Sequence, residues 1–241
     1  MRIAIVSDIH GNRTAFEAVL ADLRQTSPDL IFHGGDLADG GASPAEIVDR
    51  IRDLGWQGVV GNTDEMLFEP GSLTDFAKQS PQMQPLLATI EEMAAATREA
   101  LGEERLAWLR GLPRTQIHGP MALVHASPES RWRAPAHTAS DAELEGVYAP
   151  LGQPVAIYAH IHRAYIRSVS GMGMTVANTG SVSLSYDGDR RAAYLLLDES
   201  TPAIRRVEYD VESEITALSV CGLPHADWVA KMLASAGPLM P

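Results

Sequence analysis

Residues 1–64 alternate short apolar runs with amphipathic segments, and each apolar run ends in polar residues. The pattern predicts strands at 2–7, 30–32 and 58–60, with one helix in each interval between them. Such alternation is typical of parallel strands with helices packed on the faces of the sheet. Ligands of these sheets bind just beyond the carboxyl ends of the strands, so we expect a functional site there.

Both predicted helices have recognisable starts. Asn12 is a good N-cap for the first helix. The expected apolar face of that helix consists of Ala15, Phe16, Val19, Leu20 and Leu23. The second helix begins at a capping box between Ser43 and Glu46, with Pro44 at the first helical position. Its expected buried face consists of Ile47, Ile51 and Leu54.

The remainder of the chain predicts more helices and a second set of strands. Residues from about 70 to 110 have helical character, with few β-branched side chains. The strands expected after Pro113 lie near 121–125, 154–159, 174–177, 192–198 and 204–209, with a helix near 140–148. From Val211 onward we expect two short helices split by 222–224. Because no repeat or linker interrupts the chain, we predict one domain over 1–241, in which 65–112 is a helical insert or lid.

Composition narrows the class of protein. Of the 241 residues 45% are hydrophobic, enough to bury a large core. The single cysteine excludes an intramolecular disulfide and a thiolate metal cluster. The net charge of −12 repels phosphate backbones, so nonspecific nucleic-acid binding is not expected. A signal peptide and a span of ~18 apolar residues are both lacking, which predicts a cytoplasmic protein without a membrane partner.

Seven polar residues share one position, directly after an apolar strand. They are Asp8, His10, Asp36, Asn62, His125, His160 and His162. If the strands belong to one sheet, its edge brings these side chains together. Their oxygen and imidazole donors suit Mn, Fe, Zn, Ni or Mg better than copper. A lone Asp at a strand end usually caps a turn and a lone His is usually structural, but four of the eight histidines fall in this position. We therefore predict a metal site.

In order and spacing, these residues resemble the five motifs of the calcineurin-like metallophosphoesterases. The motifs are Asp8-x-His10, Gly35-Asp36, Gly61-Asn62-x-Asp64, His125 and His160-x-His162. The segments 178–182 and 187–192 also resemble the small prokaryotic phosphodiesterase branch of this family, so the similarity covers residues 3 to about 198. The resemblance implies an α/β fold of four layers, α-β-β-α, in which two mixed sheets pack together and helices flank them.

The resemblance also implies a binuclear centre that hydrolyses phosphate esters by a hydroxide bridging two metal ions. The ligands implied for the first ion are Asp8, His10, Asp36 and His162. Those implied for the second are Asp36, Asn62, His125 and His160. Asp36 would bridge the ions. The residues that the resemblance implies to be catalytic are Asp36, Asn62 and His125. Manganese is the first expectation, with Fe, Zn, Ni or Mg as alternatives.

The chain departs from the family pattern at three positions. Thr63 stands where many members have a histidine that stabilises the transition state or protonates the leaving group. We hypothesise that water or another residue supplies that proton, which would favour activated esters. Ala126 and Ala159 replace glycines of the fourth and fifth motifs, and each adds only a methyl group.

Several other residues have two interpretations. Asn12 and Arg163 flank ligand motifs and are candidates for binding substrate phosphate, although Asn12 equally serves as the helix cap. The basic-aromatic cluster 131–133 is expected to be a solvent-exposed loop. Asp64 is expected to support a ligand, His33 to be structural, and Cys221 to be packed in a helix.

The predicted function is a phosphodiesterase or phosphatase that acts on a small phosphate ester. A dinucleoside polyphosphate pyrophosphohydrolase shares the motif set and stays an alternative. A non-catalytic scaffold of the same fold is disfavoured because every ligand position is filled, and a nuclease is disfavoured by the charge. The physiological substrate, the native metal and the oligomeric state do not follow from the sequence.

Overall fold

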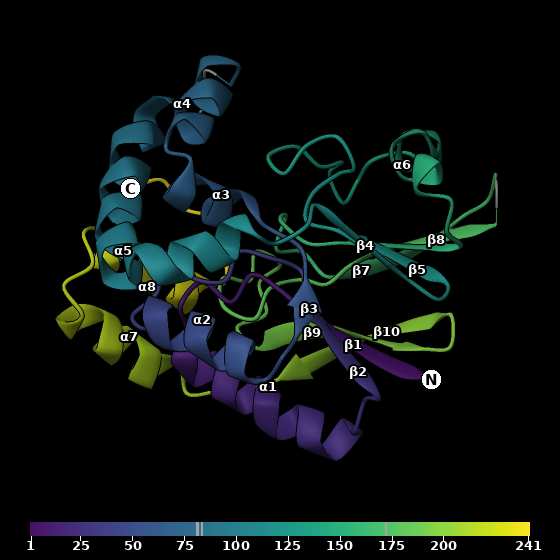
Figure 1. The fold of residues 1–241 in the computed structure, drawn as a ribbon, viewed down its shortest axis with the longest axis horizontal. Coiled ribbons are helices and arrows are strands. Elements are labelled where there is room, and N and C mark those ends of the chain that lie inside the picture. The colour runs from purple at the N-terminus through teal and green to yellow at the C-terminus, as the bar shows by residue number, and fades with distance from the viewer. Residues whose placement is uncertain (81, 83, 172) are drawn as a thin grey trace.

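Two five-stranded mixed sheets pack face to face in the computed structural model, which describes residues 1–80, 82, 84–171 and 173–241 (Figure 1). The first sheet has the order β10-β9-β1-β2-β3. Its strands are β1 (Arg2–Val6), β2 (Leu30–His33), β3 (Gln57–Gly58), β9 (Ala192–Asp198) and β10 (Thr201–Val207). The strands β1, β2 and β3 run parallel, whereas β9 is antiparallel to both of its neighbours.

The second sheet has the order β4-β5-β6-β8-β7. Its strands are β4 (Thr115–His118), β5 (Met121–Val124), β6 (Val155–Tyr158), β7 (Tyr165–Val169) and β8 (Met174–Asn178). The three central strands are parallel, and both edge strands are antiparallel to them.

Side-chain alternation along the strands separates three apolar layers. On β1, Ile3 and Ile5 face the second sheet and pack with Ile157 of β6, while Ala4 and Val6 face the helices. The helices α1 (Arg13–Thr26) and α2 (Pro44–Asp53) cover the outer side of the first sheet, and α6 (Asp141–Tyr148) covers the second (Figure 1). The four-layer α-β-β-α fold expected from the sequence is therefore confirmed.

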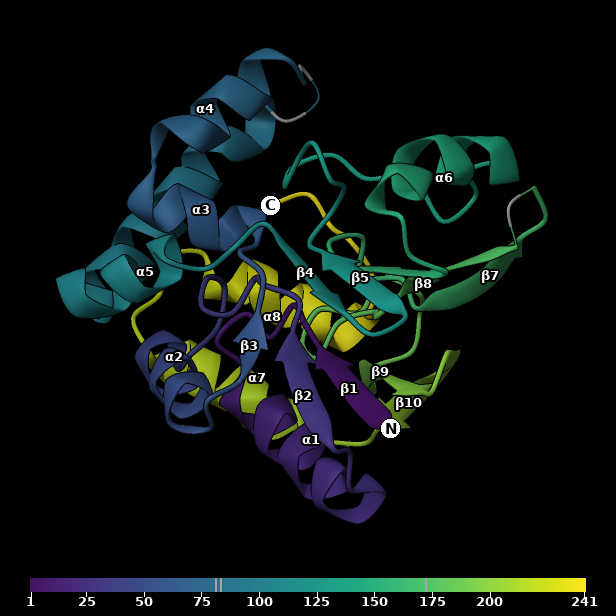
Figure 2. The ribbon, with the colours of Figure 1, turned by 45° about the vertical axis from the view of Figure 1, so that its right-hand side comes forward.

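The helical segment after the third strand contains α3 (Asn62–Phe68), α4 (Gly71–Lys78) and α5 (Gln84–Arg110), and α5 is interrupted at Gly102. Figures 1 and 2 show α4 projecting beyond the sheets. The short 3-10 helix η2 (Ala149–Leu151) follows α6. The helices α7 (Val211–Val220) and α8 (Ala226–Ser235) end the chain. The helical character expected for residues from about 70 to 110 is confirmed. The role of this segment as a lid and the single-domain assignment stay predictions.

Among the described residues, no helix is both long and apolar enough to cross a membrane.

The first helix begins and packs as the sequence predicts, whereas two predictions for the second helix are wrong. Asn12 caps α1 by accepting a hydrogen bond from the backbone of Ala15, at 2.8 Å. Ser43, in contrast, makes no side-chain cap bond to α2, so the predicted capping box is wrong. Leu54 is 38% exposed because it is the C-cap, and Val48 takes its place in the buried face.

The third strand is shorter than predicted, and two edge strands were missed. Pairing with β2 ends at Gly58, because the amide of Val60 bonds to Pro113 instead. The edge strands β4 and β7 are largely half-exposed and polar, so they lack the apolar run that marks a buried strand. Cys221 is an exposed C-cap of α7 and is not packed in a helix, contrary to expectation.

His33, at the end of β2, is fully buried. Within the described part of the chain neither of its ring nitrogens has a hydrogen-bond partner, and its ring lies 6.0 Å from that of Trp108. Burial lowers its pKa to about 3. Its imidazole is therefore neutral in the folded protein.

The burial of His33 predicts that the folded protein loses stability as the pH falls. In the unfolded chain His33 takes up a proton below pH ~6.5, so its contribution to stability is present above that pH and lost as the pH falls. Between pH 7.5 and 5.5 the free energy of unfolding should fall by about 1.4 kcal/mol less in His33→Leu than in the wild type. Urea denaturation at both pH values measures the difference. The exposed His137→Leu is the matched control, and an equal loss in all three proteins would contradict the prediction.

Candidate metal centre

The seven predicted ligands come together where the strands of both sheets end. Asp8 and His10 follow β1, and Asp36 lies three residues after β2. His125 follows β5, and the segment 160–162 follows β6 of the other sheet. The expectation that one sheet supplies all of these residues is therefore wrong, because the loops of two facing sheets converge on the site.

Potential donor atoms form two groups that share Asp36. The first group consists of Asp8, His10, Asp36 and His162, and the second of Asp36, His125 and His160. Within each group the donor atoms lie within 4.8 Å of one another. Asn62 adds an amide oxygen to the second group, at 2.9 Å from His125 Nε2 and 2.8 Å from His160 Nδ1.

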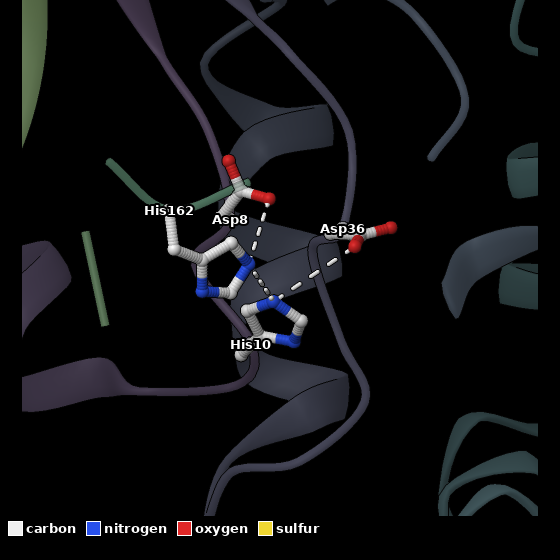
Figure 3. A group of neighbouring side chains, drawn as sticks. All are labelled: Asp8, His10, Asp36 and His162. Carbon is white, nitrogen blue, oxygen red and sulfur yellow. Dashed lines mark hydrogen bonds and ion pairs between the residues drawn. The ribbon is translucent and has the colours of Figure 1, made fainter. Parts of the chain in front are cut away.

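The first group is compact (Figure 3). His162 Nε2 lies 3.2 Å from Asp8 Oδ1 and 3.3 Å from His10 Nε2. His10 Nε2 lies 3.8 Å from Asp36 Oδ2, and the same carboxylate oxygen lies 3.4 Å from His125 Nε2 of the second group. A single carboxylate thus faces histidines of both groups.

The backbone at the site adopts an uncommon conformation. Asp8, His10, Asp36, His160 and His162 all have a positive φ, between 47° and 68°. This left-handed region is disfavoured for residues with a Cβ and persists only where the surroundings enforce it. Here backbone hydrogen bonds from Asp8 to Gly35 and from His10 to Asp36 tie the first two loops together, each at 3.0 Å.

Three of the four histidines are oriented by a backbone carbonyl. His10 Nδ1 lies 2.7 Å from the oxygen of Asp39, and His125 Nδ1 lies 2.8 Å from that of Gly34. His162 Nδ1 lies 2.6 Å from the carbonyl of Leu184. Because a carbonyl only accepts, each Nδ1 carries a proton, which leaves Nε2 as the ring nitrogen that faces the site and could bind a cation.

The loop carrying Asp36 is held by Asp64. The Asp64 carboxylate accepts hydrogen bonds from the backbone of Asp36, Leu37 and Gly61, at 2.8 to 3.0 Å. The amide of Thr63 donates to Asp36 Oδ1 at 2.9 Å. Burial and the neighbouring Asp36 raise the pKa of Asp64 to about 6. These contacts agree with the expected supporting role of Asp64.

Electrostatics favour a cation at the site. Burial alone would raise the pKa of Asp36, but the facing His125 and His10 hold it well below its usual value. His125 correspondingly has a pKa raised to about 9, because the attraction of Asp36 outweighs burial. Burial lowers the pKa of His160 to about 4, so this ring is neutral. Buried carboxylates beside imidazoles are a set of ligands that fits divalent metal ions, and a bound ion would take the place of the proton on His125.

The two predicted substrate contacts differ in their surroundings. The amide of Asn12 is occupied, since it caps α1 and donates to Ser183 Oγ at 3.2 Å. These contacts favour its interpretation as a cap. Arg163 is half-buried next to His162, and no ion pair of its guanidinium occurs in the described ranges of the chain. Substrate binding by either residue stays a prediction.

The cluster 131–133 was expected to be a solvent-exposed loop, but Arg131 and Trp132 are half-buried and Arg133 alone of the three is exposed. Arg131 forms an ion pair with Glu65, and Trp132 Nε1 donates to the same carboxylate at 2.8 Å. The Trp132 ring also stacks on Phe76 of α4, 5.0 Å away. Glu65 lies one turn after Asn62 in α3, so the cluster connects the loop after His125 to the helical segment. The sequence holds no local signal for Glu65, because its partners are more than 60 residues away.

Comparison with known proteins identifies the family. The model of the calcineurin-like phosphoesterase superfamily domain matches residues 1–202. The chain belongs to this superfamily. The family is one of phosphoesterases, a class of hydrolase, and the match confirms the resemblance inferred from the motifs.

Similar proteins span nearly the whole chain. The uncharacterized protein MJ0912 of Methanocaldococcus jannaschii is 29% identical over 258 residues, covering 96% of each chain. A metallophosphoesterase from Sphaerobacter thermophilus has a TM-score of 0.78 at 26% identity, covering 98% of this chain and all of that one. The hypothetical protein PH1004 from Pyrococcus horikoshii has a TM-score of 0.83 at 18% identity, covering 99% of each chain, which shows a shared fold.

The contact between Gly61 and Asp36 predicts a sensitive position. A Cβ at residue 61 would overlap both the carboxylate oxygen Oδ1 and the backbone nitrogen of Asp36, although the backbone of residue 61, with φ −90°, tolerates a side chain. Gly61→Ala should therefore displace the shared carboxylate and weaken Mn²⁺ binding by ~10-fold or more. Calorimetric titration with Mn²⁺ measures the affinity. Gly71→Ala, where a Cβ meets no atom within 4 Å, is the control. Equal Mn²⁺ affinities of Gly61→Ala and the wild type would contradict the prediction, because Asp36 would then move aside at little cost.

Proposed function

We propose that this protein hydrolyses small phosphate esters with two divalent metal ions, manganese being the first candidate. The observation that carries the proposal is the position of Asp36, whose carboxylate belongs to both donor groups. A shared carboxylate offsets the repulsion between two neighbouring cations. The first ion would be held by Asp8, His10, Asp36 and His162, and the second by Asp36, Asn62, His125 and His160.

The ions would supply Lewis acidity, lowering the pKa of a water molecule and neutralising charge on the phosphoryl group. The chain supplies orientation. Asp36 is fixed by the amide of Thr63, and Asn62 holds its amide oxygen between His125 and His160. The Nδ1 protons of His10, His125 and His162 are engaged by carbonyls, so these protons do not serve the leaving group.

The substrate is proposed to be a small ester and not a polynucleotide, because the net charge of −12 opposes a phosphate backbone. The resemblance to the prokaryotic branch favours diesters. A putative diadenosine tetraphosphatase shares the fold at 16% identity and a TM-score of 0.52, which carries no inference about substrate. A non-catalytic scaffold is disfavoured because all the expected donors converge.

Mutation of the shared carboxylate tests the proposal. With Mn²⁺, the wild type should hydrolyse bis-p-nitrophenyl phosphate, and more slowly p-nitrophenyl phosphate, and chelation should abolish both activities. Asp36→Asn should lower kcat/KM by ~100-fold or more, because both ions lose a charged ligand. Asp75→Asn removes an exposed carboxylate of α4 and should have wild-type activity. An active Asp36→Asn enzyme would refute the shared-carboxylate mechanism.

Because position 63 is a threonine, we predict that the rate of hydrolysis depends strongly on the acidity of the leaving group. The Thr63 hydroxyl is buried without a hydrogen-bond partner among the described residues, and it is a poor proton donor. Rates for a series of substituted aryl phosphodiesters should therefore rise steeply as the leaving phenol becomes more acidic. Thr63→His should flatten this dependence by supplying an acid. A nearly flat series for the wild type would refute the hypothesis.

A further inference from the structure

His162 is fixed at three points by a short segment that follows β8. The Tyr186 ring stacks on the imidazole, with the centroids 4.6 Å apart and the planes inclined by 21°. The amide of Tyr186 donates to the carbonyl of His162 at 3.0 Å. The carbonyl of Leu184 accepts from His162 Nδ1 at 2.6 Å. The segment 184–186 thus determines both the backbone and the ring orientation of this residue.

The same segment is held on its other side by the C-terminal helices. Tyr186 Oη donates to Met232 Sδ of α8 at 3.9 Å, and the amide of Gly188 bonds to Ala236 at 3.0 Å. Leu184 is buried in an apolar cluster with side chains of α7 and α8. These helices lie outside residues 1–202, the part that the family model matches.

Contacts of the second donor group run to other parts of the fold. His125 is oriented by Gly34, and the amide oxygen of Asn62, at the start of α3, lies against His125 and His160. His162, in contrast, faces His10, with the ring centroids 5.0 Å apart. A movement of the segment 184–186 would therefore disturb the first donor group directly, and the second indirectly, through Asp36 and the hydrogen bond from the His160 amide to Asp8 Oδ1.

We propose that α7 and α8 position His162 through Tyr186 and thereby set the metal affinity of the first donor group selectively. His162 has a φ of 55°, a strained conformation that needs several contacts to persist. The stacked ring of Tyr186 prevents the imidazole from rotating, which keeps Nε2 beside Asp8 Oδ1. Tyr186 is thus a positioning residue. The inference rests on the proposed metal centre and deepens it.

Calorimetric titration with Mn²⁺ in two backgrounds separates the groups. Asn62→Ala impairs the second group and leaves the first intact, whereas His10→Ala does the reverse. Adding Tyr186→Leu should weaken Mn²⁺ binding by ~10- to 100-fold in the Asn62→Ala background. It should change the affinity by less than about 2-fold in the His10→Ala background, because Tyr186 stacks on His162, a ligand candidate of the first group, and reaches the second group indirectly, through the shared Asp36.

Two further variants distinguish positioning from general loss of structure. Tyr186→Phe keeps the stacked ring and loses only the hydroxyl that donates to Met232, so in the Asn62→Ala background it should retain more of the affinity than Tyr186→Leu does. Met232→Ala leaves Tyr186 intact but removes its support from α8, so it should weaken only the first group. It also provides the test if Tyr186→Leu folds poorly. Tyr209→Leu removes another aromatic ring packed against the same helices and should lower the Tm without selective loss of Mn²⁺ binding.

The outcomes separate this inference from the proposed function. A wild-type protein that binds no Mn²⁺ would refute the metal centre and the proposed function together. A wild type that binds two ions, with unchanged affinity in Tyr186→Leu, would refute only the positioning role. Equal weakening of both groups by Tyr186→Leu would also overturn it, because the effect would then be structural.

Discussion

The carboxylate of Asp36 is the point on which the rest of the site depends. It faces His10 on one side and His125 on the other, and these residues come from different sheets. Burying a charge is costly unless it is paired and hydrogen-bonded. Here the amide of Thr63 and the facing imidazoles compensate for that cost, and Asp64 holds the backbone of the loop.

The surroundings of the site also maintain its strained backbone. Five ligand candidates adopt the left-handed conformation, and a single contact would not be enough to stabilise it at all of them. These residues are fixed by three kinds of contact: hydrogen bonds between the loops after β1 and β2, backbone carbonyls that orient three of the histidines, and the ring of Tyr186. Contacts within the chain thus orient the donors, which reduces the reorganisation that binding of an ion would require.

The helical elements differ in their relation to the two donor groups. The helix α3 begins at Asn62 and is tied through Glu65 to the loop that follows His125. The C-terminal helices instead contact the segment that holds His162. The two halves of the site are therefore supported by separate parts of the chain. They are joined by Asp36 and by the hydrogen bond from the His160 amide to Asp8 Oδ1.

The sequence by itself determined the family, the layered fold and the seven candidate ligands, because motifs such as Asp8-x-His10 and the apolar periodicity of α1 are local. Asn12 as the cap of α1 was predictable for the same reason. The tertiary structure alone decided that two sheets supply the ligands, that β4 and β7 extend the second sheet, and that Glu65 binds Arg131 and Trp132. It also decided that Tyr186 stacks on His162. These contacts join residues far apart in the chain or depend on ring orientation, and neither leaves a periodic pattern in the sequence.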